Sequence, residues 1–131
     1  MTDDELFEAA VRASENSYSG YSDFHVGAAL LTADGCLYTG CNIENASYSL
    51  TMCAERTAIF KAVSDGNTKF QAIAVAGSST DNFSKPCTPC GACLQVMAEF
   101  CGDDFKIILA DGSYTLADFL PKRFCEDNMN D

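Results

Sequence analysis

The chain has 131 residues, 47% of them hydrophobic, and its 19 acidic and 8 basic side chains give a formal net charge of −11. This length and composition predict a single domain over residues 1–131, with a packed core that needs no disulfide scaffold. The few Lys and Arg residues form no cluster, which disfavours a nucleic-acid partner because phosphates must be neutralised by grouped basic side chains. A small uncharged ligand is compatible with this charge.

The first predicted element is a helix over about residues 2–17. Thr2 and Glu5 are spaced as a capping box, and the apolar residues that follow recur at helical spacing. Residues 18–24 then mix turn formers with aromatic side chains, which indicates a binding loop rather than a plain linker.

The rest of the chain alternates strands and helices. Turn residues separate the paired strands, and Gly66 and Gly102 end the two later helices. In chain order, the predicted elements are strands over 26–33 and 36–42, a helix over 51–65, a strand over 70–76, a helix over 90–101, and strands over 105–110 and 114–116. This order predicts an α/β fold with one mixed sheet of about five strands between helices.

The N-terminus and the lack of long apolar runs predict a soluble, cytoplasmic protein with no membrane partner. Residues 1–5 are acidic and lack the features of a secretory signal, and no apolar run approaches a membrane span. In such a reducing compartment disulfides are rare, so the eight cysteines favour metal or catalytic roles. Those outside the predicted site are expected to be small apolar residues: Cys36, Cys41, Cys87, Cys101 and Cys125.

Three cysteines at two helix starts predict a zinc site. Cys53 lies near the start of one predicted helix, and Cys90 and Cys93 lie at the start of the next. Unpaired N–H groups and the helix dipole favour the thiolate that a metal needs. Three thiolates can hold Zn²⁺ and leave a fourth position for water, as in catalytic sites. The only histidine, His25, is distant in sequence, so a ligand set of three cysteines is favoured.

Spacing alone leaves alternatives open at the second cluster. Cys87 with Cys90 forms a PCxxC pair that rivals Cys90 with Cys93, and the later pair is preferred because it runs directly into a helical stretch. A redox CxxC motif is a further alternative, but it gives no role to Cys53 or Glu55.

Glu55 and Arg56 extend the predicted site. Glu55 follows Cys53 by two residues, where its carboxylate can reach the open zinc position, although a solvated helix carboxylate is the commoner role. A glutamate that moves protons without binding the metal is part of the zinc deaminase signature. Three thiolates leave a zinc site with a charge of about −1. Arg56 is therefore predicted to donate to a ligand sulfur, the alternative being a surface arginine.

Four motifs in order resemble the small homotetrameric cytidine deaminases of pyrimidine salvage. They are YSDFHVGAA at 21–29, TGCNIENASY at 39–48, CAER at 53–56 and PCGACLQV at 89–96. The resemblance covers nearly the whole chain and selects Cys93 over Cys87. It implies a three-layer α/β/α cytidine-deaminase-like fold, a homotetramer, and one Zn²⁺ per subunit held by Cys53, Cys90 and Cys93.

The resemblance also implies a set of substrate contacts. These are Phe24 and Phe124 on the pyrimidine, Asn42 and Glu44 on the ribose hydroxyls, Ala46 and Tyr48 along the pocket, the Ala54 backbone N–H on the base carbonyl, and the Thr88 carbonyl on the departing amine. Ordinary core packing is the alternative for the two phenylalanines. The chain departs from the family pattern at Leu94, where the family commonly has Arg, and a local surface or interface change is expected there.

The expected reaction is hydrolytic deamination of cytidine and 2′-deoxycytidine to uridine and 2′-deoxyuridine. Zinc hydroxide would attack C4, with Glu55 as the proton shuttle. Glu44 near the sugar would repel a phosphate, so a free nucleoside is the expected substrate. The alternatives are an editing deaminase, which lacks its basic surface here, a deaminase for another cytosine nucleoside, and a non-enzymatic zinc domain, which leaves Glu55 without a role.

Overall fold

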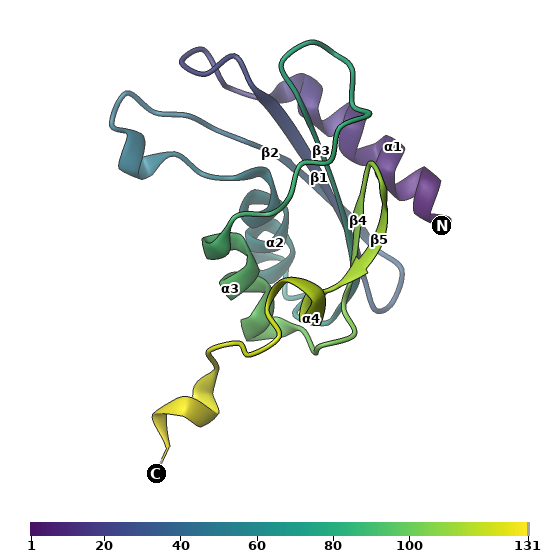
Figure 1. The fold of residues 1–131 in the computed structure, drawn as a ribbon, viewed down its shortest axis with the longest axis vertical. Helices are drawn as coiled ribbons and strands as arrows, with labels where there is room; N and C mark the ends of the chain where they lie inside the picture. The colour runs from purple at the N-terminus through teal and green to yellow at the C-terminus, as the bar shows by residue number, and fades with distance from the viewer. Residues whose placement is uncertain (131) are drawn as a thin grey trace.

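A computed structural model of the chain describes residues 1–130 and contains a five-stranded sheet with helices on both faces (Figure 1). The elements are α1 (Asp3–Ala13), β1 (His25–Thr32), β2 (Leu37–Cys41), α2 (Ala54–Ser64), β3 (Phe70–Ser78), α3 (Gly91–Phe100), β4 (Lys106–Leu109), β5 (Gly112–Thr115) and α4 (Leu116–Phe119). The predicted α/β order is confirmed. The short helix α4 was not predicted.

The sheet has the strand order β2-β1-β3-β4-β5. β3 and β4 are parallel because α3 connects them, whereas β1 pairs antiparallel with both β2 and β3, and β4 pairs antiparallel with β5. The prediction of a mixed sheet of about five strands is therefore confirmed.

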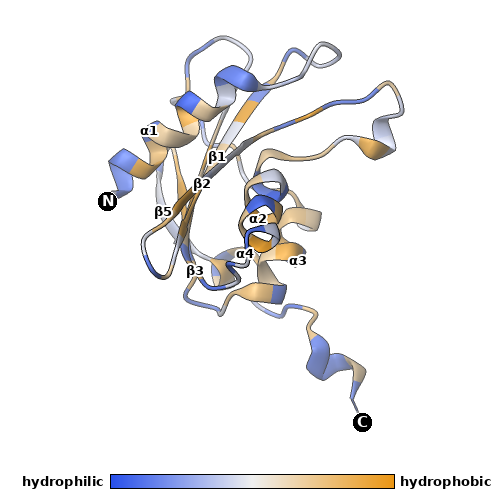
Figure 2. Cartoon of the chain, turned by 180° about the vertical axis from the view of Figure 1, so that it is seen from behind, coloured by the Kyte–Doolittle hydropathy of each residue, from blue (hydrophilic) through white to orange (hydrophobic). Residues whose placement is uncertain are grey.

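Helix α1 covers one face of the sheet and α2 and α3 cover the other, which gives three layers (Figures 1 and 2). Side chains alternate between faces along each strand. Leu30 and Ile73 pack in the cluster under α2 and α3, whereas Ala29 and Ala74 pack in the cluster under α1. The central strands β1 and β3 are therefore buried on both faces, whereas the edge strands β2 and β5 are partly exposed.

The predicted helix boundaries need correction at one end of each of the first two helices. Thr2 caps α1 with the predicted capping box, but the helix ends at Ala13 rather than 17 and continues as a short 3₁₀ turn. Helix α2 starts at Ala54 rather than 51, because Met52 is held in an extended bridge with Ile43. None of the helices among residues 1–130 has the length and apolar composition needed to cross a membrane.

The segment after α4 leaves the body of the molecule as a tail (Figure 1). Arg123 Nη1 donates to the backbone carbonyls of Cys101 and, at 3.5 Å, Ala98. These carbonyls lie at the C-terminal end of α3, where free acceptors are available. The arginine thus fastens the base of the tail to α3.

Candidate metal centre and active site

Three cysteine thiols gather where α2 and α3 begin. Cys53 is the N-cap of α2, Cys90 is the N-cap of α3, and Cys93 lies in the first turn of α3. The Sγ atoms of Cys53 and Cys90 are 3.8 Å apart, and those of Cys90 and Cys93 are 3.4 Å apart. Thiolates about 2.3 Å from a tetrahedral zinc ion lie about 3.8 Å from one another, so the cluster fits zinc.

The other sequence candidates for ligands lie outside this cluster. The group of three sulfurs found within 4.8 Å of one another consists of Cys53, Cys90 and Cys93, without Cys87. The ring of His25 instead has Nδ1 3.0 Å from Ser19 Oγ. The structure thus brings together the three predicted cysteines and leaves the histidine apart.

Arg56 lies against the cluster from the first turn of α2. Its Nη2 donates to Cys53 Sγ at 3.5 Å, and its Nε is buried without a hydrogen-bond partner among the described residues. Hydrogen bonds from the Cys93 thiol and the Arg56 guanidinium lower the pKa of Cys53 to about 5. The arginine therefore places a positive charge beside sulfurs that would otherwise carry uncompensated negative charge.

Glu55 is the second residue of α2, directly after Ala54. It is buried, with 4% of its surface exposed. Burial raises its pKa to about 7, and the charge on Cys53 acts in the same direction. A carboxyl group in this condition exchanges its proton near neutrality, which suits a general acid and base.

Glu55 faces a hollow of about 180 Å³ that also reaches two of the three clustered cysteines. The residues that line it are Val26, Asn42, Thr51, Met52, Cys53, Ala54, Glu55, Cys87, Thr88 and Cys90. Of the predicted substrate contacts, Asn42, Ala54 and Thr88 lie here. The sequence reasoning missed Val26, Thr51, Met52 and Cys87 as lining residues. For Cys87 its place inside the PCTPC motif was an available signal, whereas the other three carried none.

The remaining predicted contacts do not line this hollow. Tyr48 is exposed and packs edge-on against Tyr21, with ring centroids 5.6 Å apart. Phe124 is exposed on the tail, where its backbone carbonyl accepts from Gln95 Nε2 at 2.9 Å. Phe24, Glu44 and Ala46 also lie outside the lining.

Asn42 is buried and holds the start of β1 in place. Its Oδ1 accepts from the Val26 backbone N–H at 3.0 Å and from the Ser17 hydroxyl, and its Nδ2 donates to the Phe24 carbonyl at 2.9 Å. One N–H of the amide is left for a ligand, because an asparagine carries two donors. The same side chain therefore faces the hollow and fixes the backbone of Phe24.

Glu44 organises the loop over residues 18–24. Its carboxylate accepts from the backbone N–H groups of Tyr21 and Ser22, both at 3.1 Å, and from the Ser22 hydroxyl. The Ser22 hydroxyl bond lowers the pKa of Glu44. A carboxylate offers about four acceptor positions, so about one remains for a ligand hydroxyl.

Close contact between β2 and α2 fixes the distance of helix α2 from the sheet. A Cβ on Gly40 would lie 2.6 Å from the Ala58 nitrogen and 2.7 Å from the Ala54 carbonyl oxygen. Neither backbone atom can yield as a flexible side chain could. Glycine at this position therefore lets the start of α2 rest directly on the strand.

Leu94 corrects an expectation from the sequence. It is buried, with 6% exposure, and belongs to the apolar cluster with Met97 beneath α3. The expected surface change is therefore wrong, because the side chain points into the core, where leucine adds apolar packing.

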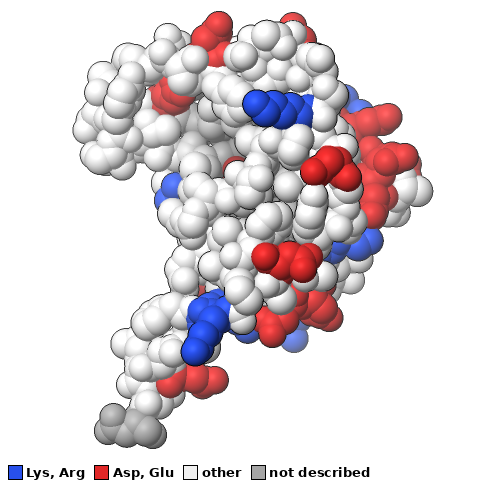
Figure 3. Space-filling view, viewed as in Figure 1, with Lys and Arg blue, Asp and Glu red and all other residues white. Residues whose placement is uncertain are grey.

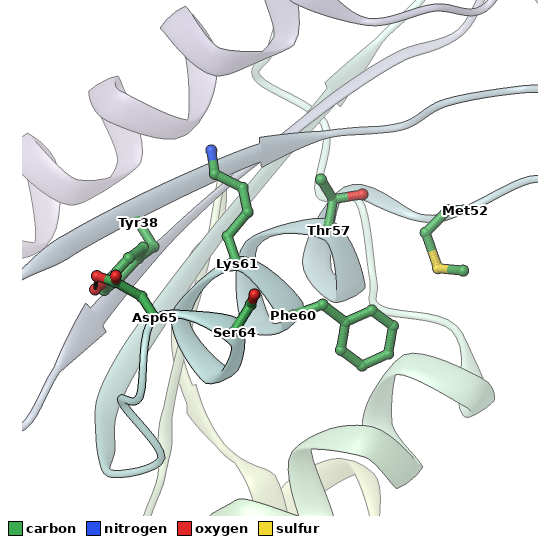
Figure 4. Close-up of a pocket in the computed structure, with 7 residues that line it drawn as sticks. All are labelled: Tyr38, Met52, Thr57, Phe60, Lys61, Ser64 and Asp65. Atoms are coloured by element: carbon green, nitrogen blue, oxygen red, sulfur yellow. Dashed lines mark hydrogen bonds between the residues drawn. The ribbon is translucent and has the colours of Figure 1, made fainter.

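A larger hollow lies elsewhere and offers no convergent chemistry. It has about 630 Å³ and is lined by Tyr38, Met52, Thr57, Phe60, Lys61, Ser64 and Asp65 along α2 (Figure 4). The Asp65 carboxylate accepts from the Tyr38 hydroxyl, and Lys61 donates to the Thr39 carbonyl. Its charged groups are thus already engaged, and it contains none of the three clustered cysteines.

Comparisons with known proteins show the family to which the chain is similar. The family model for the cytidine and deoxycytidylate deaminase zinc-binding region matches residues 1–109. A cytidine deaminase of Halalkalibacterium halodurans is 48% identical over 131 residues, covering 96% of each chain. One of Sporosarcina psychrophila is 45% identical over 135 residues, covering 99% of this chain and 96% of its own.

A solved structure adds the fold. The crystal structure of cytidine deaminase from Burkholderia pseudomallei matches with a TM-score of 0.85 at 46% identity, covering 95% of this chain and 100% of that chain. Fold, cysteine cluster and matches together define a zinc-type hydrolase that acts on the C–N bond of a cyclic amidine. The chain belongs to the cytidine and deoxycytidylate deaminase zinc-binding family.

Proposed function

We propose that the chain deaminates free cytidine and 2′-deoxycytidine to uridine and 2′-deoxyuridine, releasing ammonia, in pyrimidine salvage. The observation that carries this proposal is the buried Glu55 carboxyl, which shares one hollow with Cys53 and Cys90 of the thiol cluster. A closed structural metal site would have no use for a titratable carboxyl beside it.

Cys53, Cys90 and Cys93 would hold one Zn²⁺ per subunit. The distances between their sulfurs and their positions at helix starts support this assignment. When bound with three protein ligands, zinc supplies a Lewis acid that activates water as a nucleophile near neutral pH.

Glu55 carries the protons of the reaction. It accepts one from the attacking water and delivers it to N3 of cytosine, which makes C4 electrophilic. It then takes the remaining proton from the hydroxyl added at C4 and passes it to the amino group, so that the C4–N bond breaks, ammonia leaves and the C4 carbonyl forms. Its low exposure supports this role, because burial keeps the carboxyl from exchanging its proton with bulk solvent.

Backbone groups of the hollow orient the base. Ala54 opens α2, where its N–H has no partner within the helix and is available to the base carbonyl. The Thr88 carbonyl accepts from the departing amine. Both residues line the hollow beside Glu55, which supports these assignments.

The sugar is held by hydrogen-bonding positions of Asn42 and Glu44 that the protein itself does not use. Asn42 has one free N–H and Glu44 about one free acceptor position, so a single hydroxyl can satisfy both. Phe24 and Phe124 pack on the pyrimidine, and Ala46 and Tyr48 complete the pocket. A phosphate on the sugar would meet the Glu44 carboxylate, so nucleotides are poor substrates.

The partner in solution is a nucleoside rather than a polynucleotide or a membrane, and the enzyme is a cytoplasmic homotetramer. On the face shown in Figure 3, acidic groups outnumber scattered basic ones, which supports the first statement. The exposed apolar side chains Tyr48, Leu50 and Phe60 support burial against other copies.

One assay tests the proposal. The ultraviolet absorbance of cytidine is followed with the purified protein, with and without a zinc chelator, alongside cytidine monophosphate and a short single-stranded oligonucleotide. Loss of absorbance is expected with cytidine only, and the chelator should abolish it. Efficient turnover of the nucleotide or the oligonucleotide, or full activity in protein shown to be free of zinc, would contradict the proposal.

A further inference from the structure

Gly77 lies at the end of β3 and faces the same layer as Ile73 and Val75, next to the catalytic hollow. A Cβ placed on it would lie 2.8 Å from Cys87 Sγ and 3.0 Å from Phe24 Cε2. Real side-chain carbon atoms essentially never lie within 3.0 Å of another heavy atom, so the Cys87 thiol would have to shift, while the Phe24 ring at 3.0 Å would have to give by a few tenths of an ångström. Because Gly77 has no side chain, the Cys87 thiol and the Phe24 ring can both pack against the strand at this position.

Cys87 and Phe24, the two side chains next to Gly77, line different hollows. Cys87 lines the catalytic hollow beside Glu55 and Thr88. Phe24 borders a second hollow of about 400 Å³ together with Gly77. Cys87 and Phe24 thus both lie at Gly77, each lining one of the two hollows.

The Cys87 thiol contributes to this arrangement through its volume and not through its chemical reactivity. Burial raises the pKa of Cys87 to about 11, so the group stays neutral at physiological pH. Cys87 also lies outside the three-sulfur cluster. It is therefore neither a thiolate nucleophile nor a ligand, and it fills space between the strand and the hollow.

We propose that Gly77 and Cys87 are positioning residues that seat the Phe24 ring and so set the width of the base-binding side of the catalytic hollow. The inference rests on the proposed function, in which Phe24 packs on the pyrimidine. A methyl group at position 77 would push the Cys87 thiol towards the catalytic hollow, which it lines, and would displace the Phe24 ring, which lines the neighbouring hollow. Thr88 would move with Cys87, since the two are neighbours in the chain.

The principal test is the Gly77→Ala variant. Its KM for cytidine should rise by about tenfold while kcat falls by less than about threefold, because Phe24 would hold the base equally in the ground and transition states. Its zinc content should equal that of the wild type. The matched control is Gly102→Ala, where a Cβ would meet only the carboxylate of Asp104 at 3.3 Å, and its KM should be unchanged.

A rescue separates positioning from general damage to the fold. The Cys87→Ala change removes the sulfur nearest to the added methyl group, so the double variant Gly77→Ala, Cys87→Ala should recover a KM within about threefold of the wild type. Because relief of the clash with Cys87 Sγ would also restore a damaged fold, the Tm and zinc content of both variants are measured beside KM, and a raised KM at an unchanged Tm marks a positioning role. Failure of the double variant to improve on Gly77→Ala would therefore overturn the proposal.

Variants of Cys87 alone keep the test decisive if Gly77→Ala does not fold. Cys87→Ser preserves size and should keep KM within about twofold, whereas Cys87→Val enlarges the group and should raise KM by about fivefold. Unchanged KM in Cys87→Val would overturn the proposal. If the wild type does not deaminate cytidine at all, the proposed function has failed instead, so the two failures are distinguishable.

Discussion

Glu55 is an ionisable side chain that is almost completely buried. Burial disfavours its charged form, and this makes the group suited to proton transfer. A carboxyl group removed from water holds its proton more tightly, and the neighbouring Cys53 thiolate adds to this effect. The result is a group that can give and take a proton near neutral pH. An exposed glutamate on the same helix would remain ionised.

Replacing this carboxyl group should separate metal binding from turnover. The variant Glu55→Gln keeps the size and the burial but cannot carry a proton, so kcat should fall by about 10²–10⁴-fold. Zinc content, measured by atomic absorption, should remain at the wild-type level. Glu99→Gln on the exposed face of α3 is the matched control and should leave kcat unchanged. Near-normal turnover in Glu55→Gln would refute the proton-carrying role.

Arg56 should matter for retention of the metal. In Arg56→Gln the hydrogen bond to Cys53 Sγ is weakened and the positive charge is lost, so zinc affinity should fall by about 10–100-fold. Competition with a coloured chelator measures this directly. Arg12→Gln on α1 removes the same charge far from the cysteines and serves as control. Equal retention of zinc in both variants would contradict the assignment.

The chemical core of the site could be predicted from sequence because its residues are local to two helix starts. Cys53 and Glu55 are two positions apart, and Cys90 and Cys93 share one turn. The PCTPC motif drew attention to Cys87, but its place beside Gly77 could not be predicted, because Gly77 lies on a different element. Contacts of that kind leave no periodicity in the sequence.

Helix α3 shows how an element can be predicted while its ends are not. Its apolar spacing and the following Gly102 indicated a helix over 90–101, but Cys90 and Cys101 are caps rather than helical residues. Helix α2 likewise begins later than predicted, because the chain before its cap Cys53 is extended, with Met52 bridged to Ile43. The helix α4 has only four residues, too few to show any helical spacing, and so it was missed.

The cap at the end of α3 predicts a pH dependence of stability. Burial raises the pKa of Cys101 to about 12 from its ordinary 9.0, so the thiol stays protonated in the folded protein while the unfolded chain ionises. The unfolded state then binds fewer protons. The free energy of unfolding should therefore fall as pH rises from about 9 towards 12, by at most about 1.4 kcal/mol per pH unit.

Urea denaturation under reducing conditions, at about pH 8 to about pH 10, measures this effect. The Cys101→Ala variant lacks the group, so its stability deficit relative to the wild type should shrink as pH rises. Cys36→Ala, which removes an exposed thiol, should follow the wild-type pH dependence. A constant difference between Cys101→Ala and the wild type would show that burial of this thiol is not linked to folding.

At the scale of the whole molecule, the architecture could be predicted well because each helix and strand has its own pattern. The hairpin turns and the alternation of elements implied a mixed sheet between helices, and the sheet has this form. The strand order was not predicted, because it depends on which edges bury the most apolar surface. The tail was also beyond prediction, since its anchor at Arg123 is a side chain bonded to distant carbonyls.

The net charge of −11 predicts a stabilising effect of salt. Repulsion among like charges disfavours the compact state, and added salt screens it. The Tm of the zinc-loaded protein should therefore rise between about 0.02 M and about 0.3 M sodium chloride. A variant with three exposed acids neutralised, Glu8→Gln, Glu15→Gln and Glu99→Gln, should respond less. A Tm that falls with salt would show that attractive pairs dominate instead.

Helices usually begin with a side chain that ties down their own first turn, yet Cys53 and Cys90 make no such hydrogen bond. The bound metal would join the two beginnings to each other in its place. On demetallation both first turns should fray, so that amide hydrogens at 54–57 and 91–94 exchange with deuterium faster while those of β1 and β3 stay protected. Loss of zinc would then change the shape of the enzyme's pocket as well as remove its chemistry.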